Sequence, residues 1–273
     1  MTNFMCLTCG TQFAESDAPP ERCPVCEDAR QYVGWDGQRW TTMQALGADH
    51  RTRIEEDAGI LGIGIDPKFA IGQRALLVEN ETGNILWDCV PLVDDRAVAA
   101  VRDRGGLAAI AISHPHYYSA MVEWSRALGG VPIFLHEADR DWVMRPDPAL
   151  QYWGGDSLEL PGGFTLLRLG GHFAGGAVLH DPRGAGALFT GDIIQVVMDR
   201  RWVSFMYSYP NLIPLPAAWV RGTAERLEAL DFERIYGAFW GRVVSSNGKD
   251  ALRRSAARYI RALEDGARPA PST

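Results

Sequence analysis

Four of the five cysteines stand near the N-terminus as two pairs, each with two residues between its members. Two such pairs joined by a short loop can bring four thiolates to one ion in a tetrahedron. Gly10, directly after the second cysteine, lets the backbone turn toward a sulfur without a side chain in the way. The spacing therefore predicts a metal site formed by four residues, Cys6, Cys9, Cys23 and Cys26.

A second group of metal-binding residue types follows predicted strands. His114 and His116, with one residue between them, follow closely after the aliphatic run 107–112. His172 lies in a glycine-rich turn after another predicted strand, and Asp192 follows the end of a third. Strand ends are where α/β folds place their chemistry. Three neutral imidazoles with an open fourth position form a catalytic zinc arrangement, in which the pKa of bound water falls to about 7.

The elements that must position these residues can be read from the hydrophobic pattern. The predicted strands span residues 69–78, 84–89, 108–112, 131–135, 164–169, 175–180 and 186–190. The predicted helices span residues 94–104, 117–128, 137–144, 216–230 and 248–264. Residues 79–83 have the composition of a hairpin turn between the first two strands. This mixture of strands and helices predicts an α/β domain with helices on the sheet faces.

Composition divides the chain into four parts. Residues 1–32 hold four cysteines and too little aliphatic content for a core of their own, so we expect a metal-stapled ribbon. Residues 33–60 are rich in charge and glycine and are predicted to connect the ribbon to a main domain over 61–265. Residues 266–273 contain two prolines and are predicted to be a frayed tail.

Charge and hydropathy exclude several classes of partner. The formal net charge is -7, and no basic run exceeds a pair such as Arg200-Arg201, so nucleic acid is not expected as a partner. The longest aliphatic run has six residues, whereas a membrane span needs roughly 20. The first five residues lack the basic and apolar regions of a signal peptide. We therefore expect a cytoplasmic protein without a membrane partner.

Two family resemblances refine this interpretation. The segment 18–26 resembles the second knuckle of short rubredoxin-like domains, such as those on rubrerythrins. The order of His114, His116, His172 and Asp192 resembles the metallo-β-lactamase superfamily over about 60–265. The family motif is His-x-His-x-Asp-His, then a histidine in a glycine-rich turn, an aspartate after Thr-Gly, and a late histidine before glycine. The resemblance implies a metallo-β-lactamase αββα sandwich, and assigns these four residues to its first metal site and bridging carboxylate.

Three positions depart from the family motif. Tyr118 and Ser119 stand where the family has aspartate and histidine, and Trp240 stands where it has the late histidine. None of these is a good metal ligand, so we expect one ion in the cleft, zinc or iron, and no second ion. Asp192 would then ligate the ion or orient a water, and Tyr118 would donate a hydrogen bond to a substrate oxyanion. Asp88, at the end of an early strand, would support a histidine ligand.

These predictions favour a mononuclear metallo-hydrolase that attacks an ester, lactone, thioester or amide of a small molecule with a metal-bound hydroxide. Two alternatives stay open. Persulfide dioxygenases of the same superfamily hold a single iron on two histidines and one aspartate, whose counterparts here are His114, His172 and Asp192. The chain can also be a non-catalytic binding module. In the ribbon, zinc would be a structural staple and iron a redox centre, and a protein partner or self-association through the ribbon is possible.

Overall fold

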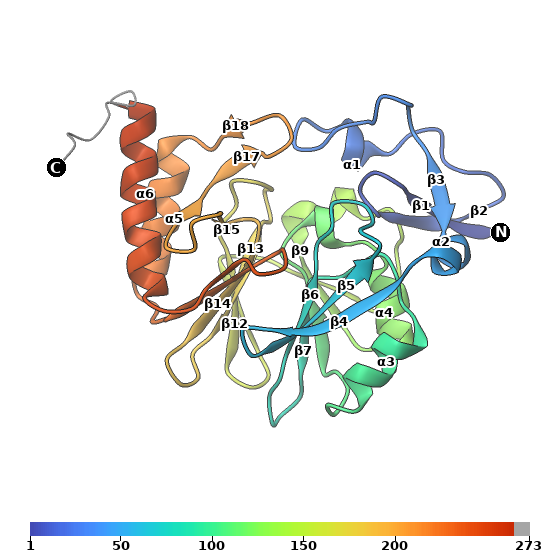
Figure 1. The fold of residues 1–273 in the computed structure, drawn as a ribbon, viewed down its shortest axis with the longest axis horizontal. Helices are drawn as coiled ribbons and strands as arrows, with labels where there is room; N and C mark the ends of the chain where they lie inside the picture. Colours follow the sequence, from blue (N-terminus) through green and yellow to red (C-terminus); the bar gives the residue numbers. More distant parts are fainter. Residues whose placement is uncertain (265–273) are drawn as a thin grey trace.

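The computed structural model describes residues 1–264, and the predicted tail 266–273 lies outside the described residues. Two sheets form the body of the molecule (Figure 1). In spatial order, the seven-stranded sheet contains β10 (Leu150–Trp153), β9 (Ile133–His136), β8 (Ala109–Ala111), β7 (Ile85–Trp87), β6 (Ala75–Val78), β5 (Ile60–Asp66) and β4 (Arg51–Asp57). The six-stranded sheet contains β11 (Ser157–Leu160), β12 (Phe164–Arg168), β13 (Ala177–Asp181), β14 (Ala187–Gly191), β19 (Arg234–Gly237) and β20 (Val243–Val244).

The alternation of side chains along each strand explains why the sheets stack. In β6, Leu76 faces the other sheet and packs in one cluster with Phe189 of β14. Its neighbour Leu77 faces the opposite way and packs in a cluster with residues such as Trp124. In β13, Val178 likewise packs in a cluster with Val220 on the outer side. The outer faces are covered by two pairs of helices, α3 (Asp95–Arg102) with α4 (Met121–Ala127), and α5 (Ala217–Leu227) with α6 (Gly248–Glu264).

This αββα arrangement confirms the predicted fold class. Each of the strands and helices predicted from the hydrophobic pattern has a counterpart in the structure, with three main differences. The helix predicted over 117–128 begins only at Met121, after the 3₁₀ turn Pro115–Tyr117. The first strand begins at Ala75 rather than at residue 69, because residues 69–72 form a turn closed by the Gly72 amide on the Phe69 carbonyl. The segment predicted as a helix over 137–144 is a short 3₁₀ helix, Glu137–Trp142. The hairpin turn between β6 and β7 is confirmed.

The predicted connecting segment, 33–60, contributes one strand to each of two sheets. β3 (Trp40–Thr42) pairs with β1 (Thr2–Cys6) in the small N-terminal sheet, whose third strand is β2 (Gln12–Ser16). After α2 (Met43–Asp49), β4 pairs along its whole length with β5. The ribbon is thereby continuous with the edge of the main sheet.

Two short hairpins cover the upper end of the six-stranded sheet in Figure 1. They are β15 (Gln195–Val196) with β16 (Val203–Ser204), and β17 (Met206–Ser208) with β18 (Ile213–Pro214). The hairpin of β17 and β18 lies beside the ribbon, where Asn211 donates hydrogen bonds to two ribbon carbonyls. None of the helices within residues 1–264 combines the length and the apolar character that crossing a membrane requires.

Candidate metal centres

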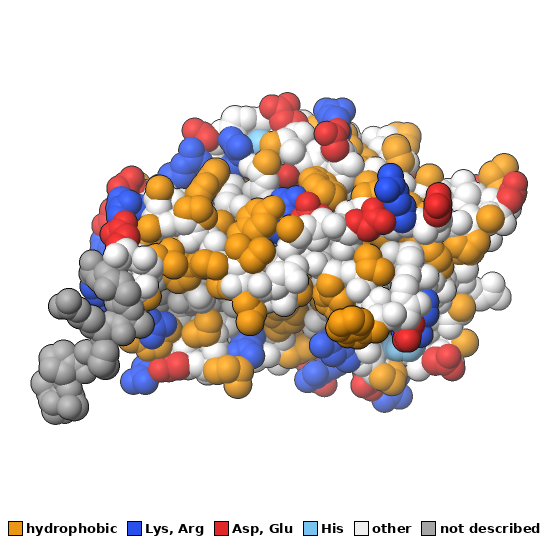
Figure 2. Space-filling view, turned by 90° about the horizontal axis from the view of Figure 1, so that it is seen from above, with side chains coloured by type: hydrophobic (Ala, Val, Ile, Leu, Met, Phe, Trp, Pro, Cys, Tyr) orange, Lys and Arg blue, Asp and Glu red, His pale blue; other side chains and the backbone are white. Residues whose placement is uncertain are grey.

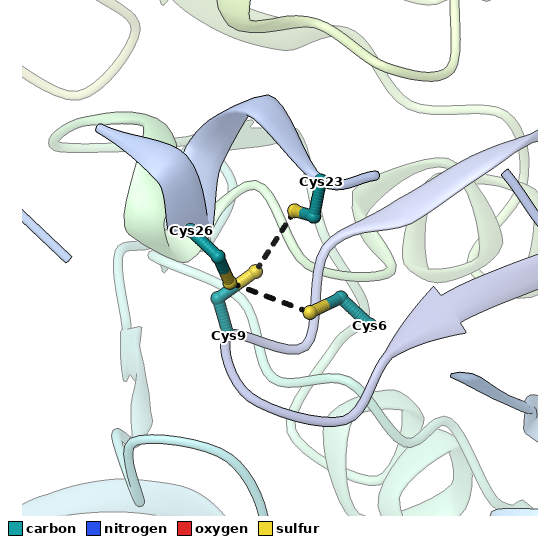
Figure 3. Close-up of side chains that lie close together, drawn as sticks. All are labelled: Cys6, Cys9, Cys23 and Cys26. Atoms are coloured by element: carbon teal, nitrogen blue, oxygen red, sulfur yellow. Dashed lines mark hydrogen bonds between the residues drawn. The ribbon is translucent and has the colours of Figure 1, made fainter. Parts of the chain in front are cut away.

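The ribbon brings all four predicted cysteine ligands together (Figure 3). Cys6 is the last residue of β1 and Cys9 lies in the turn after it, whereas Cys23 directly precedes α1 (Pro24–Glu27) and Cys26 lies within it. The Sγ atoms of Cys6 and Cys26 are 3.4 Å apart, and those of Cys9 and Cys23 are 3.7 Å apart. Tetrahedral Zn–S bonds of about 2.3 Å place sulfurs about 3.8 Å apart. The donor set therefore fits a single tetrahedral ion.

This four-cysteine centre is closed to solvent. All four side chains are buried, and the Gln38 amide donates to Cys6 Sγ at 3.1 Å. The neighbouring sulfurs, that of Cys23 first, and then burial raise the pKa of Cys9 well above its ordinary value. Four crowded, buried thiols cannot all ionise without a cation, and a bound ion removes that obstacle. Burial on all sides is typical of a structural metal site.

The second group lies where strands of both sheets end. His114 and His116 belong to the turn after β8, His172 to the loop between β12 and β13, and Asp192 follows β14 directly. His114 Nε2 is 3.1 Å from Asp192 Oδ1, and His172 Nε2 is 3.3 Å from His116 Nδ1. All the ligand atoms lie within 4.8 Å of one another. The structure thus brings together the four residues that the sequence predicts.

Glycines permit this close approach of the two sheet ends. Gly191, the last residue of β14, has a φ of +54°, and a Cβ there would lie 2.5 Å from Ser113 Oγ. Gly170 has a φ of +68° and directs the chain into the His172 turn. Both positions need the left-handed conformation, which side chains other than glycine rarely adopt. The Thr-Gly-Asp and glycine-rich motifs are therefore requirements of the turns that carry the ligands.

Hydrogen bonds fix the orientation of the imidazole rings. His172 Nδ1 lies 2.7 Å from the Tyr207 carbonyl oxygen and donates to it, which leaves Nε2 with a free lone pair. His114 Nδ1 lies 2.9 Å from Ser113 Oγ. Asp88 accepts a hydrogen bond of 2.7 Å from the Ser113 amide. Burial raises the pKa of Asp88 to about 7. Asp88 therefore supports the loop that carries His114 through the Ser113 amide.

The protonation states suit metal binding. Burial, the largest cause, lowers the pKa of His172 to about 4, so its imidazole is neutral at neutral pH. Burial raises the pKa of Asp192, but its interactions with His114 and His172 outweigh burial and hold this pKa below its ordinary value. His114 Nε2 and Asp192 Oδ1 are buried and face each other at 3.1 Å, and neither has another hydrogen-bond partner within residues 1–264. The neutral His172 imidazole, the ionised Asp192 carboxylate and the two buried ligand atoms fit one divalent ion.

The three residues that depart from the family motif lie away from this group. Ser119 Oγ accepts a hydrogen bond of 3.0 Å from Gln73. The Trp240 ring lies against Gly62 and Gly64 of β5, where a Cβ at either glycine would meet it at less than 3.0 Å. The residue that the late turn contributes beside Asp192 is Phe239 instead. The expectation that no second ion binds stays a prediction.

Tyr118 does not reach the group either. It is buried in the core cluster between the seven-stranded sheet and its helices, and the charged or polar neighbours that raise its pKa, after burial, are Asp139 and Tyr152. Its neighbour Tyr117 takes the inner position, with its ring centroid 4.5 Å from that of His114. The position of Tyr118 gives no support to its predicted role as a donor to the substrate.

Sequence reasoning missed two tyrosines near the group. The hydroxyl of Tyr117 is buried without a hydrogen-bond partner, and the Asp192 charge, after burial, raises its pKa. Tyr209 donates a hydrogen bond of 2.7 Å to the Asp192 carbonyl oxygen. His136, by contrast, bonds to Gly155 and to its own turn, which is a structural role. The sequence signal for Tyr117 was its place inside the His-Pro-His turn.

A cavity of about 280 Å³ opens onto the histidine group. His116 and Asp192 form one part of its wall, and residues 30–32 of the ribbon form another. The remaining lining residues are Lys68, Ala70, Ile71, Gln195, Tyr209, Pro210 and Phe239. Figure 2 shows the upper face of the molecule, on which hydrophobic side chains lie among charged ones. Because it borders a cavity, this centre has the open side that a catalytic metal site needs.

Solved structures identify the fold. The chain is similar to the DIM-1 metallo-β-lactamase, with a TM-score of 0.58 and 16% identity over 78% of this chain and 99% of that one. It is also similar to a metallo-β-lactamase from Hirschia baltica, with a TM-score of 0.53 and 17% identity over 76% of this chain and 96% of that one. The fold is therefore the metallo-β-lactamase fold, with a four-cysteine ribbon added at its N-terminus.

A much nearer relative is the uncharacterised protein YmaE of Bacillus subtilis (strain 168). The two sequences are 47% identical over 269 residues, which cover 96% of this chain and 97% of YmaE. No protein-family model matches the sequence. The chain belongs to the same family as YmaE.

Proposed function

We propose that the protein is a mononuclear metal-dependent hydrolase that opens an ester, lactone, thioester or amide in a small organic molecule. The observation that carries this proposal is the convergence of His114, His116, His172 and Asp192 beside a cavity. Ligands that surround an ion on one side and leave a cavity on the other permit a substrate to reach it. The fold agrees with hydrolysis, but a fold alone does not define a reaction.

When bound, a divalent ion in this set would polarise a carbonyl oxygen and lower the pKa of a coordinated water to about 7. The chain supplies orientation around it. Tyr207 and Ser113 hold the rings of His172 and His114, and Asp192, as a carboxylate, ligates the ion or orients a water. Apolar side chains such as Ile71 and Phe239 receive the organic part of the substrate and limit the access of water.

In the ribbon we propose zinc as a structural staple, because four buried sulfurs form a closed site. Residues 1–32 contain little aliphatic material, so metal binding would supply much of the free energy that folds them. A cytoplasmic location and a protein partner or self-association through the ribbon stay predictions.

The test is metal analysis of protein purified without added metal, followed by assays against lactones, thioesters and aryl esters. We expect two zinc ions per chain and turnover of at least one substrate class. One ion per chain, held by the ribbon, with no turnover would reject the hydrolase and favour the binding module. Iron in the cleft, with oxygen consumption in the presence of a persulfide, would favour the dioxygenase alternative instead.

A further inference from the structure

The segment that follows the last cysteine leads from the ribbon directly to the histidine group. Asp28, two residues after Cys26, binds the Arg30 side chain through both carboxylate oxygens, at 2.5 Å to Nε and 2.8 Å to Nη2. Asp28 also accepts a hydrogen bond of 2.9 Å from the Arg30 amide. The two side chains are 18% and 12% exposed, so this pair is largely shielded from solvent. The guanidinium is therefore held in one orientation.

Arg30 in turn contacts the loop that carries His172. Its Nη1 donates a hydrogen bond of 3.2 Å to the His172 carbonyl oxygen. Its guanidinium lies 3.8 Å from the centroid of the Phe173 ring, within the range of a cation–π contact. The Phe173 ring packs edge-on against His116, with centroids 4.9 Å apart. A single ribbon side chain thus contacts the backbone of one candidate ligand and the aromatic ring that packs against another.

A second contact holds the same segment. Asn211, in the hairpin of β17 and β18, donates hydrogen bonds to the carbonyls of Ala29 at 2.8 Å and Gln31 at 3.1 Å. Tyr207 of this hairpin also accepts the hydrogen bond from His172 Nδ1. Residues 28–31, the hairpin and the His172 loop therefore form one connected unit.

We propose that the ribbon is part of the candidate catalytic site, and that Arg30 is a positioning residue for His172. The ion in the ribbon fixes Cys26, the turn after it fixes residues 28–31, and Arg30 fixes the His172 loop. Binding at the two metal centres is then coupled, and the coupling free energy acts equally in both directions. This coupling rests on the proposed function in one respect: it requires that the cleft bind a metal ion.

The test uses the full chain loaded with zinc and measures how tightly each ion is held against a competing colorimetric zinc chelator. The Cys23→Ser and His172→Ala variants, each with one centre disrupted, identify which ion is which. Arg30→Met keeps the length of the side chain but removes its hydrogen-bond donors. Arg30→Lys restores a donor, and Arg22→Met is the matched control, because Arg22 lies on the same ribbon with a 73% exposed side chain.

We expect Arg30→Met to weaken zinc binding in the cleft by about 10- to 100-fold, as for other groups that orient a metal ligand, and to leave direct ligation in the ribbon intact. Arg30→Lys should recover part of the loss, and Arg22→Met should show none. A cleft affinity within about threefold of the parent in Arg30→Met, or an equal loss in Arg22→Met, would overturn the proposal.

Hydrogen exchange of the His172 loop separates this proposal from the proposed function. In metal-free protein, Arg30→Met should speed exchange of the amides in residues 169–176 relative to Arg22→Met, and unchanged exchange would refute the positioning role. If the parent chain binds no ion in the cleft, the hydrolase and the coupling of the two ions both fail. The exchange measurement then still decides whether Arg30 orders the loop.

Discussion

The two candidate metal centres of this protein offer different ligand atoms in different surroundings. The ribbon centre has four sulfurs, all buried, on loops that contain almost no other apolar core. The histidine centre has three imidazoles and a carboxylate at the ends of two large sheets, and it borders a cavity. The first arrangement is typical of ions that stabilise a fold, and the second of ions that meet a substrate. Within one chain, the buried centre is expected to be structural, and the centre that borders a cavity is expected to be catalytic.

The scaffold of each centre differs as much as its ligands. Three apolar clusters support the main domain, formed between its sheets and under its helices. The ribbon's own cluster consists of its cysteines and Val25, with three partly buried aromatic side chains packed against it, and its Met5 packs with Leu46, Phe69 and Leu92. The main domain therefore supplies a rigid frame for its ligands, whereas the ribbon depends on its own ion for order. Loss of the ribbon ion should therefore disorder the ribbon, whereas loss of the cleft ion should abolish activity and leave the fold intact.

The largest effect is expected from His172→Ala. Removal of the His172 imidazole leaves only His114, His116 and Asp192 as ligands for the ion. The hydrogen bond from Arg30 to the carbonyl of residue 172 then no longer orients a ligand. We expect loss of the cleft ion and of all measurable turnover, with the ribbon ion retained and the fold unchanged. Metal content per chain and circular dichroism measure these outcomes. Retention of both ions would show that His172 is not a ligand.

Cys23→Ser should disrupt the ribbon centre instead. Three thiolates bind zinc less tightly than four, so the ribbon ion should be lost and the ribbon should become sensitive to proteases. The main domain should stay folded, because its three apolar clusters contain none of the four cysteines. Through residues 28–31, the cleft affinity should fall as well. An unchanged metal content would reject the four-thiolate centre.

These expectations show how far the sequence alone leads. Both ligand sets could be predicted, because the Cys-x-x-Cys pairs and the histidines after strand ends are local signals. The edge strand β4 was not predicted, since its sequence, Arg-Thr-Arg-Ile-Glu-Glu-Asp, is mostly charged, as exposed edge strands often are. Its place in the sheet depends on pairing with β5, which is a tertiary contact.

The orientation of individual side chains was also beyond the sequence. Tyr117 and Tyr118 are adjacent and are buried in the same core cluster, and only the 3₁₀ turn Pro115–Tyr117 determines that it is the first ring that packs against His114. Trp240 was assigned to the cleft by its order in the chain, but its ring lies against the glycines of β5. The contact between Arg30 and His172 joins positions 142 residues apart, which no local pattern reveals.

A third, smaller effect on turnover is expected from substitution of Tyr117 or Tyr118. From the sequence, Tyr118→Phe is expected to lower turnover about 100-fold, as for a lost oxyanion donor. The structure favours Tyr117→Phe instead, because the buried Tyr117 hydroxyl lies in the field of the Asp192 carboxylate. We expect about a tenfold loss of kcat for Tyr117→Phe and less than about threefold for Tyr118→Phe, with the cleft ion retained in both. A large loss in Tyr118→Phe alone would restore the original assignment.

The smallest predicted effect concerns the open side of the histidine centre. Lys68 lines the cavity, and its aliphatic stem lies across Gly72, where a Cβ would meet Lys68 Cε at 2.5 Å. The other lysine of the chain, Lys249, pairs with Asp231 at 3.1 Å, whereas Lys68 forms no ion pair within residues 1–264. A substrate that carries a carboxylate would supply the missing counter-charge.

We therefore expect Lys68→Met to raise KM about fivefold for succinyl thioesters and to leave KM for the matched butyryl thioesters unchanged, because an exposed charged contact contributes roughly 1 kcal/mol. The value of kcat should change little, since Lys68 lies beside the cavity and is not among the ligand atoms. Lys249→Met is the control and should alter neither. Equal KM values for both thioesters in the parent would show that the cavity does not select for a carboxylate. The difference between the closed ribbon centre and the open histidine centre would then depend on the histidine ligands alone.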